Sequence, residues 1–212
     1  MARFLLVLDV DSTLIEDEVI ELIAEHAGVR EQVAAVTARA MRGELDFAGS
    51  LVERVATLEG LPVSVLDEVR DRVRVTAGVP ELIAGVQAAG GVFAVVSGGF
   101  HEILDPLAAL LGIDRWRANR LAVRDGRLTG QVDGPIVDAA AKAAALREWA
   151  AGAGIPLSRS VAIGDGANDL GMMAAAGLSI AFDAKPAVRE SADLSLPVRD
   201  LAAVLGVLGL RG

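Results

Sequence analysis

The sequence contains no cysteine and no tyrosine, and its only two histidines are His26 and His101. Without cysteine, the chain cannot form a disulfide framework, a thiolate nucleophile or a cysteine-ligated metal site. Two histidines are too few for a three-histidine metal site. No apolar run approaches the roughly 20 residues that a membrane helix needs. These absences exclude thiol chemistry, histidine-cluster chemistry and a membrane-spanning helix.

The charge balance is acidic, with 20 Lys and Arg against 29 Asp and Glu, a formal net charge of −9. Such a charge argues against a surface that binds nucleic-acid phosphates or an anionic membrane. The 212 residues are 53% hydrophobic and 23% charged, which is typical of an ordered globular chain and sufficient for one domain with a subdomain. We expect a cytoplasmic protein, monomer or homodimer, with no nucleic-acid or membrane partner.

Short apolar runs alternate with helical patterns along most of the chain. The runs are typical of strands buried on both faces of a sheet, namely Phe4–Leu8, Val92–Val96, Val161–Ile163 and Leu178–Phe182. The helical patterns are Val79–Ala89, Glu102–Leu111, Ala140–Ala151 and Asp169–Ala175. Strands that alternate with helices imply right-handed crossovers, so the sequence predicts an α/β fold with a doubly wound, mostly parallel sheet. An Asp-Gly turn within Val123–Leu128 predicts one hairpin.

The segment from Glu16 to Arg74 departs from this alternation. It has the pattern of several consecutive amphipathic helices, with breaks near Gly28, Gly43 and Leu61-Pro62. A crossover between parallel strands needs only about a dozen residues, so this segment is much too long for one. We therefore expect residues 1–15 and 75–212 to form the α/β core and residues 16–74 to form a small helical cap inserted after the first strand.

Polar residues and glycines follow three of the predicted strands: Asp9, Asp11, Ser97, Gly98, Gly99, Asp165, Asn168 and Asp169. Each is also common in turns or helix caps, but ligands of open α/β sheets bind at the carboxyl ends of strands, where all of them converge. Clustered carboxylates raise one another's pKa and favour a hard divalent cation such as Mg²⁺. A hydroxyl and glycine backbone N–H groups suit phosphate oxygens. Lys142, near the start of an alanine-rich helix, is a candidate second cation.

These motifs resemble the four motifs of the haloacid-dehalogenase-like phosphatase superfamily. The matching residues are Asp9-Val10-Asp11-Ser12-Thr13, Ser97-Gly98-Gly99, Lys142 and Gly164-Asp165-Gly166-Ala167-Asn168-Asp169. Further segments resemble the phosphoserine phosphatase family within it: Asp17-Glu18, Val95–Phe100, Ala118-Asn119-Arg120-Leu121 and Ala184-Lys185-Pro186. The resemblance extends over nearly the whole chain.

The resemblance implies roles for the residues of the predicted core. Asp9 would be the nucleophile that becomes an aspartyl-phosphate, and Asp11 would be the general acid and base. Mg²⁺ would bind the side chains of Asp9 and Asp165 and the backbone carbonyl of Asp11, with Asp169 acting through water or orienting the site. The groups around the phosphoryl group would be Ser97, Gly98, Gly99, Lys142 and Asn168.

The resemblance also implies roles in the cap and an activity. Glu18 would bind the ammonium group of an amino-acid substrate, Arg54 would bind its carboxylate, and Met41 and Phe47 would shield the site. The implied reaction is hydrolysis of O-phospho-L-serine to L-serine and phosphate, the last step of serine biosynthesis. Alternatives are a phosphatase for another small phosphomonoester, a phosphotransferase to an alcohol such as homoserine, and a non-catalytic phosphometabolite-binding module. The last is disfavoured by the presence of both Asp9 and Asp11.

Neither histidine is part of this prediction. His26 and His101 lie in helical patterns, and no Arg-His-Gly motif accompanies either of them. We expect both to be structural.

Overall fold

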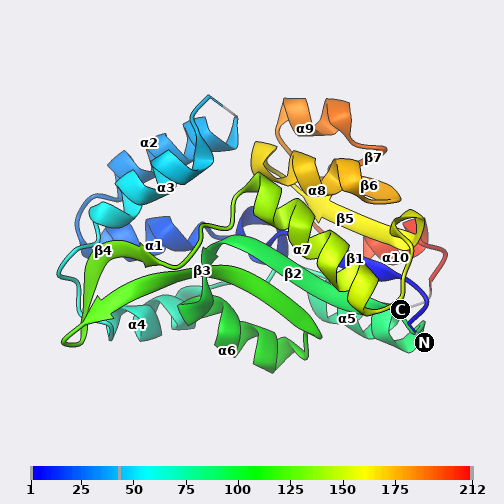
Figure 1. The fold of residues 1–212 in the computed structure, drawn as a ribbon, viewed down its shortest axis with the longest axis horizontal. Coiled ribbons are helices and arrows are strands. Elements are labelled where there is room, and N and C mark those ends of the chain that lie inside the picture. Colours follow the sequence, from blue (N-terminus) through cyan, green and yellow to red (C-terminus); the bar gives the residue numbers. More distant parts are fainter. Residues whose placement is uncertain (1, 43, 211–212) are drawn as a thin grey trace.

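A seven-stranded sheet organises the computed structural model, which describes residues 2–42 and 44–210 (Figure 1). Its strand order is β4-β3-β2-β1-β5-β6-β7. The strands are β1 (Leu5–Leu8), β2 (Val92–Phe100), β3 (Arg115–Arg124), β4 (Arg127–Asp133), β5 (Ser160–Gly164), β6 (Leu178–Phe182) and β7 (Leu194–Leu196). Neighbouring strands are parallel except β3 and β4, which form an antiparallel hairpin. The prediction of a doubly wound, mostly parallel sheet is confirmed.

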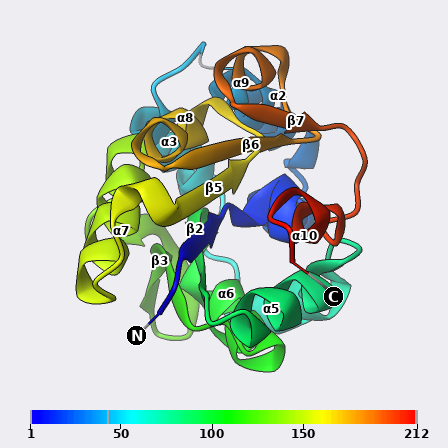
Figure 2. The ribbon, with the colours of Figure 1, turned by 90° about the vertical axis from the view of Figure 1, so that its right-hand side faces the viewer.

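Helices cover both faces of the sheet (Figure 2). One face packs against α5 (Val79–Ala88), α6 (His101–Leu111) and α10 (Ala203–Val207). The other packs against α7 (Ala139–Gly152), α8 (Leu170–Ala175) and α9 (Pro186–Ser191). Successive side chains of a strand point to opposite faces, so Leu6 and Leu8 belong to the first hydrophobic cluster and Leu5 and Val7 to the second. This is why the strands appear as continuous apolar runs in the sequence.

The sheet face that carries α7 contains many small side chains. The hydrophobic cluster on this face includes the buried alanines Ala94, Ala162 and Ala181 of the strands and Ala143, Ala145 and Ala150 of α7. Because the distance between packed elements depends on the side chains at the contact, alanine on both sides lets the helix lie close to the sheet. That proximity carries Lys142, which has no exposed surface, to the end of β1.

Four helices lie between β1 and the point where the chain re-enters the α/β core, before α5. They are α1 (Val19–His26), α2 (Arg30–Met41), α3 (Phe47–Ala56) and α4 (Val65–Arg72). The structure has the expected breaks at Gly28, whose φ is +71°, and at Leu61-Pro62, whereas Gly43 lies outside the described residues. The chain leaves and re-enters the core side by side, since the Glu16 N–H donates to the Arg74 carbonyl at 2.9 Å.

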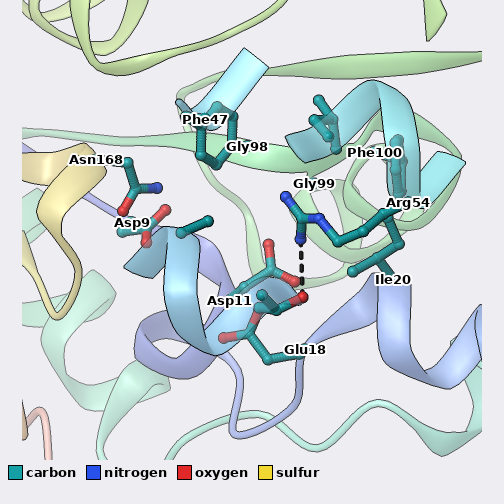
Figure 3. Close-up of a pocket in the computed structure, with 13 residues that line it drawn as sticks. Asp9, Asp11, Glu18, Ile20, Phe47, Arg54, Gly98, Gly99, Phe100 and Asn168 are labelled. Carbon is teal, nitrogen blue, oxygen red and sulfur yellow. Dashed lines mark hydrogen bonds between the residues drawn. The ribbon is translucent and has the colours of Figure 1, made fainter. Parts of the chain in front are cut away.

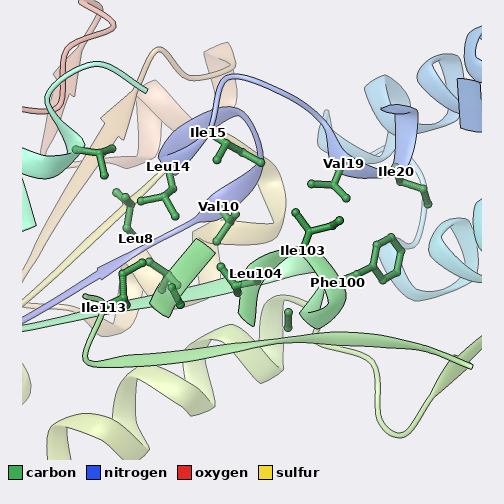
Figure 4. Close-up of a cluster of buried hydrophobic side chains, with 14 of the residues drawn as sticks. Leu8, Val10, Leu14, Ile15, Val19, Ile20, Phe100, Ile103, Leu104 and Ile113 are labelled. Carbon is green, nitrogen blue, oxygen red and sulfur yellow. The ribbon is translucent and has the colours of Figure 1, made fainter. Parts of the chain in front are cut away.

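The first hydrophobic cluster continues from the core into this helical segment (Figure 4). Leu8 and Leu14, beside the sheet, belong to the same cluster as Val19 and Ile20 of α1. Ile103 of α6 lies between them in the close-up and is 2% exposed. The base of the helical segment is therefore anchored by apolar packing as well as by backbone hydrogen bonds.

Some element boundaries differ from those that the sequence predicts. β2 continues to Phe100 instead of ending at Val96, and its pairing with β3 shifts register between these residues. The helix expected from Asp169 begins at Leu170, after a short turn (η3, Ala167–Asp169). Other turns are η1 (Val10–Leu14) and η2 (Leu157–Arg159). In the hairpin, the turn residues Asp125 and Gly126 have φ values of +50° and +71°, the left-handed conformation that a two-residue turn needs.

The helices are short. Within residues 2–42 and 44–210, none is long and apolar enough to cross a membrane.

Candidate active site

The direction of strand order reverses at β1, and the candidate site lies at this point. β2 pairs with one edge of β1 and β5 pairs with the other. Asp9 directly follows β1, and Asp165 directly follows β5. Such a reversal opens a crevice at the carboxyl ends of the strands. The topology therefore brings Asp9 and Asp165 together although they lie far apart in the sequence. The Thr13 hydroxyl, in the turn that follows Asp9, donates to Oδ1 of Asp165 at 3.5 Å.

The turn η1 sends the side chains of Asp9 and Asp11 to different partners. Within the turn Asp11 has an extended backbone, and Ser12 has a φ of +58°, a left-handed conformation that is uncommon for a residue with a side chain. The Asp11 carboxylate accepts hydrogen bonds from the Val19 N–H at 2.8 Å and the Ser97 hydroxyl at 3.0 Å. The Asp9 carboxylate instead faces Lys142.

Lys142 joins two of the buried aspartates. Its Nζ donates to Oδ1 of Asp9 at 2.5 Å and to Oδ1 of Asp169 at 2.7 Å. Burial by itself would lower the pKa of Lys142, but the charges of Asp169 and Asp9 outweigh it and raise the pKa. Asp138 fixes the start of α7 by accepting from the Ala141 N–H at 2.8 Å. Lys142 is therefore a fully charged group held in place by its helix and by two carboxylates.

Asp9, Asp165 and Asp169 form a compact group of buried carboxylates. Each offers an oxygen, and these atoms all lie within 4.8 Å of one another. Burial, followed by the charge of Asp169, raises the pKa of Asp9, and its Oδ2 has no hydrogen-bond partner among the described residues. Burial also raises the pKa of Asp165. An unpartnered buried oxygen within a set of oxygen donors fits a hard divalent cation, so this cluster could hold a metal. The Asp11 carboxyl is not a member of the cluster.

Asp169 also holds the loop that follows β5. Its Oδ2 accepts from the backbone N–H groups of Asp165 at 3.2 Å and Gly166 at 3.1 Å. A Cβ on Gly164 would lie 2.3 Å from the Asp169 carboxylate, a distance that no real side chain tolerates. The glycine in this motif is thus required by the close approach of the carboxylate to the backbone.

One pocket opens above these residues and is lined from two sides (Figure 3). From the core it is lined by Asp9, Asp11, Gly98, Gly99 and Asn168, and from the helical segment by Glu18, Thr37, Phe47 and Arg54. Ser97 and Lys142 lie behind this lining, in contact with Asp11 and Asp9. The structure therefore brings the candidate residues of both regions to one cavity. The side chain of Met41 lies outside the described part of the structure.

Two glycines of β2 allow the pocket walls to meet. A Cβ on Gly98 would lie 2.4 Å from the Phe47 ring, and one on Gly99 would lie 2.7 Å from Oδ2 of Asp11. The Gly99 N–H donates to the Ser97 hydroxyl oxygen at 2.7 Å. Small residues are therefore needed here for close packing, in addition to leaving backbone groups accessible.

The charged groups on the helical side lack ionic partners. Arg54 is 5% exposed and donates from Nε to the Ser50 carbonyl at 3.0 Å and from Nη1 to the Thr37 hydroxyl at 2.9 Å. No carboxylate of the described residues lies within 4 Å of its guanidinium. Glu18 accepts from the Ser12 hydroxyl at 2.6 Å, and burial, with the charge of Asp11 next, raises its pKa to about 8.

The two histidines lie away from the pocket lining. His26 Nδ1 lies 3.9 Å from Glu68 on α4. His101 Nδ1 lies 2.6 Å from Asp105, and its Nε2 accepts from the Ala118 N–H at 3.2 Å. Both sets of contacts join secondary-structure elements to one another.

The structure adds site residues to which the sequence analysis gave no role. Lys185 pairs with Oδ2 of Asp165. Asn119 donates to the Gly98 carbonyl at 2.8 Å and accepts from the Val137 N–H at 2.7 Å, so it joins the glycine segment to the loop before α7. Lys185 and Asn119 both lie in segments that resemble the family, and this resemblance could have identified them as site residues. Thr37 lies on an ordinary alanine-rich helix, and nothing in its sequence context marks it.

Comparison with known proteins gives a consistent match. Residues 6–174 match the family described as haloacid dehalogenase-like hydrolase. A protein of Streptomyces coelicolor named phosphoserine phosphatase is 57% identical over 209 residues, which cover 99% of this chain and 51% of that protein. This chain thus spans about half the length of that relative. A phosphoserine phosphatase of Streptococcus thermophilus is 52% identical, with 96% of this chain and 95% of that protein covered.

A solved structure has the same fold. It is described as a phospho-aspartyl intermediate analogue of phosphoserine phosphatase, and it superimposes with a TM-score of 0.95 at 43% sequence identity. The superposition covers 98% of this chain and 99% of the other.

Proposed function

The chain belongs to the haloacid dehalogenase-like hydrolase family, and we propose that it hydrolyses O-phospho-L-serine to L-serine and phosphate. One observation carries the proposal: a single pocket has two differently held aspartates, Asp9 and Asp11, on one wall and the charged pair Glu18 and Arg54 on the other. The names of the relatives and the solved aspartyl-phosphate analogue support it. A phosphomonoester that also carries an ammonium group and a carboxylate requires the aspartates of one wall and the Glu18–Arg54 pair of the other.

The first step transfers the phosphoryl group to Asp9. Its Oδ2, which has no hydrogen-bond partner, forms a bond to phosphorus while the bond from phosphorus to the serine oxygen breaks. The proton that the leaving oxygen requires comes from Asp11, because burial raises the pKa of this carboxyl and favours its protonated form. L-serine and an aspartyl-phosphate are the products of this step.

The second step regenerates Asp9. Water attacks phosphorus, its proton passes to Asp11, and the bond between phosphorus and the Asp9 oxygen breaks to release phosphate. Two adjacent aspartates can divide these tasks because their surroundings differ: Asp9 contacts the Lys142 cation, whereas Asp11 contacts a hydroxyl and a backbone N–H. Ser97, Gly98, Gly99, Lys142 and Asn168 are proposed to surround the phosphoryl group.

A magnesium ion fits the buried carboxylates and is part of the proposal. The side chains of Asp9 and Asp165 and the backbone carbonyl of Asp11 would hold it, with Asp169 acting through water. When bound, the cation neutralises charge on the phosphoryl oxygens and the carboxylates. Titration with Mg²⁺ should raise the midpoint of thermal unfolding of the wild type. The Asp165→Asn variant should lose this shift, and an unchanged shift would contradict the assigned ligands.

Residues 16–74 are proposed to act as the cap that selects the substrate. Glu18 would bind the ammonium group and Arg54 the carboxylate, while Met41 and Phe47 would shield the reacting groups. Arginine suits this role because its planar fork binds a carboxylate through two parallel hydrogen bonds. The cap assignment explains why charged groups line the pocket from a segment that contributes none of the seven strands.

The decisive experiment compares substrates that lack one group each. Phosphate release should be Mg²⁺-dependent with phosphoserine, and kcat/KM should fall by roughly 10⁴-fold with phosphoethanolamine or phosphopropionate. Equal values for all three would contradict an amino-acid substrate. Adding homoserine and assaying for phosphohomoserine tests the phosphotransferase alternative, which predicts that product in place of free phosphate.

The proposal includes the setting of the enzyme. We expect it to act in the cytoplasm, as a monomer or homodimer, on a small molecule and without a nucleic-acid or membrane partner. The net charge of −9 is consistent with this expectation.

A further inference from the structure

We propose that Thr37 is a specificity-determining positioning residue that aims the Arg54 guanidinium at the substrate carboxylate. The inference rests on the proposed function, in which Arg54 binds that carboxylate. Thr37 lies on α2 and Arg54 on α3, and the Thr37 hydroxyl accepts a hydrogen bond from Nη1 of Arg54 at 2.9 Å. Both side chains line the pocket, and Figure 3 shows Arg54 there.

Two anchors from different helices fix the plane of the guanidinium. The Ser50 carbonyl, one turn earlier on α3, accepts from Nε at 3.0 Å. This bond alone would leave the group free to swing about the bonded atom. The second bond, from Nη1 to Thr37, removes that freedom. A guanidinium has five N–H donors, so these two bonds leave three for a carboxylate.

The chemistry of threonine matters as much as its position. Thr37 is 4% exposed and Arg54 is 5% exposed, so their contact is almost free of water. A hydroxyl satisfies one buried donor without carrying a charge. An aspartate or glutamate at this position would neutralise the guanidinium and compete with the substrate. Threonine therefore orients Arg54 and leaves its positive charge available.

The Phe47 ring completes the surroundings of Arg54. The guanidinium carbon lies 6.0 Å from the ring centroid, and the described residues offer no carboxylate within salt-bridge distance of it. The group is thus held by a carbonyl, a hydroxyl and a ring, all uncharged. A buried cation that makes no direct ion pair gains from an anion that enters the pocket.

Removing the hydroxyl while keeping the shape tests the inference. The Thr37→Val variant leaves the Nη1 donor without its acceptor, and a misaligned fork loses the geometry for two parallel bonds. We expect KM for phosphoserine to rise about tenfold, with kcat within about twofold of wild type. With phosphoethanolamine, which has no carboxylate, KM should stay unchanged. Thr37→Ser restores the hydroxyl and should restore KM for phosphoserine.

A double-substitution cycle separates this inference from the proposed function. Arg54→Ala should raise KM for phosphoserine further, and adding Thr37→Val to it should cause no additional loss. If Arg54→Ala raises KM but Thr37→Val does not, Thr37 has no positioning role although the proposed function stands. Equal effects of Thr37→Val on both substrates would reduce Thr37 to a packing residue and overturn the inference. If neither substitution changes KM for phosphoserine, both the inference and the assigned cap contacts are wrong.

Discussion

The pocket has two walls that hold their ionisable groups differently. The core wall is formed by residues of the α/β core such as Asp9 and Asp11, and the cap wall by residues of the proposed cap such as Glu18 and Arg54. On the core wall the buried charges other than Asp11 pair with one another, since Lys142 contacts Asp9 and Asp169, and Lys185 contacts Asp165. On the cap wall Glu18 and Arg54 contact only uncharged groups. Opposite charges that neutralise one another are preorganised for a reaction common to many phosphomonoesters. Ionisable groups without ionic partners gain from binding a substrate of opposite charge, so the cap wall is the one that can distinguish one substrate from another.

The largest expected effect comes from removing the proposed nucleophile on the core wall. Asp9→Asn keeps the shape of the side chain but lacks a carboxylate to attack phosphorus, so kcat should fall by at least about 10⁴-fold. Phosphate release from phosphoserine, with Mg²⁺ present, measures this. Asp71→Asn, at an exposed carboxylate on α4, is the matched control and should retain wild-type kcat. A variant that kept more than one-tenth of the activity would exclude a covalent intermediate on Asp9.

The mutual pairing of the core charges predicts a loss of stability when one cation is removed. Lys142→Met leaves Asp9 and Asp169 buried without their shared partner, which should lower the free energy of unfolding by about 3–5 kcal/mol. Urea denaturation in metal-free buffer measures it. The control is Lys185→Met, because the Lys185 side chain is 35% exposed and water can replace it near Asp165. Equal losses for both variants would mean that burial of the pair does not govern the effect.

A substitution on the cap wall should instead change substrate specificity. Arg54→Lys keeps the charge but loses the planar fork, so we expect KM for phosphoserine to rise by about 10²-fold with little change in kcat. Phosphoethanolamine should be used equally well by both proteins. The free energy of unfolding should change far less than in Lys142→Met, because no carboxylate depends on Arg54 for its partner. If kcat fell with both substrates, Arg54 would have to contact the reacting phosphoryl group.

The sequence predicts the core wall better than the cap wall, for physical reasons. Asp9, Asp11 and Asp165 follow apolar strands, and parallel strands bring their carboxyl ends to one edge, so local pattern and topology are enough to place them. The contact of Glu18 and Arg54 with the same pocket depends on how four amphipathic helices pack, which periodicity does not specify. Thr37 illustrates this limit, since its role arises from a hydrogen bond across two helices.

The sequence pattern also does not predict where β2 ends. The Ser97-Gly98-Gly99 segment was expected after β2, but it lies within the strand, where the register shift admits it. Glycine suggests a turn when only propensity is considered. Here the glycines are required because Phe47 and Asp11 approach the strand too closely for a Cβ. Their position near the carboxyl end of β2 depends on topology and not on the local turn.

The last expected effect is a pH-dependent change in the free energy of unfolding, caused by the buried carboxyl of Glu18, which has no ionic partner. Burial raises the pKa of Glu18 from 4.5 to about 8, so between these pH values the folded protein keeps a proton that the unfolded chain has lost. Stability from this proton is complete below about pH 4.5 and is lost as pH rises through about 8. Glu18→Gln cannot ionise and keeps its contact to Ser12. In metal-free buffer its unfolding free energy should match wild type at acid pH and increasingly exceed it as pH rises from about 4.5 to about 8.

This last experiment measures stability and substrate binding in the same cap-wall variant, which should be more stable than wild type and less selective for phosphoserine. Without the carboxylate, KM for phosphoserine should rise, since the ammonium group loses its charged partner. Glu53→Gln, at an exposed position on α3, should follow wild type in both stability and KM. Thermal unfolding monitored across the pH range decides the matter: parallel curves for wild type and Glu18→Gln would show that Glu18 ionises freely in the folded protein. A gain in stability that grows with pH, together with a higher KM, would show that an acid destabilising the empty pocket is retained because the substrate's ammonium group stabilises it.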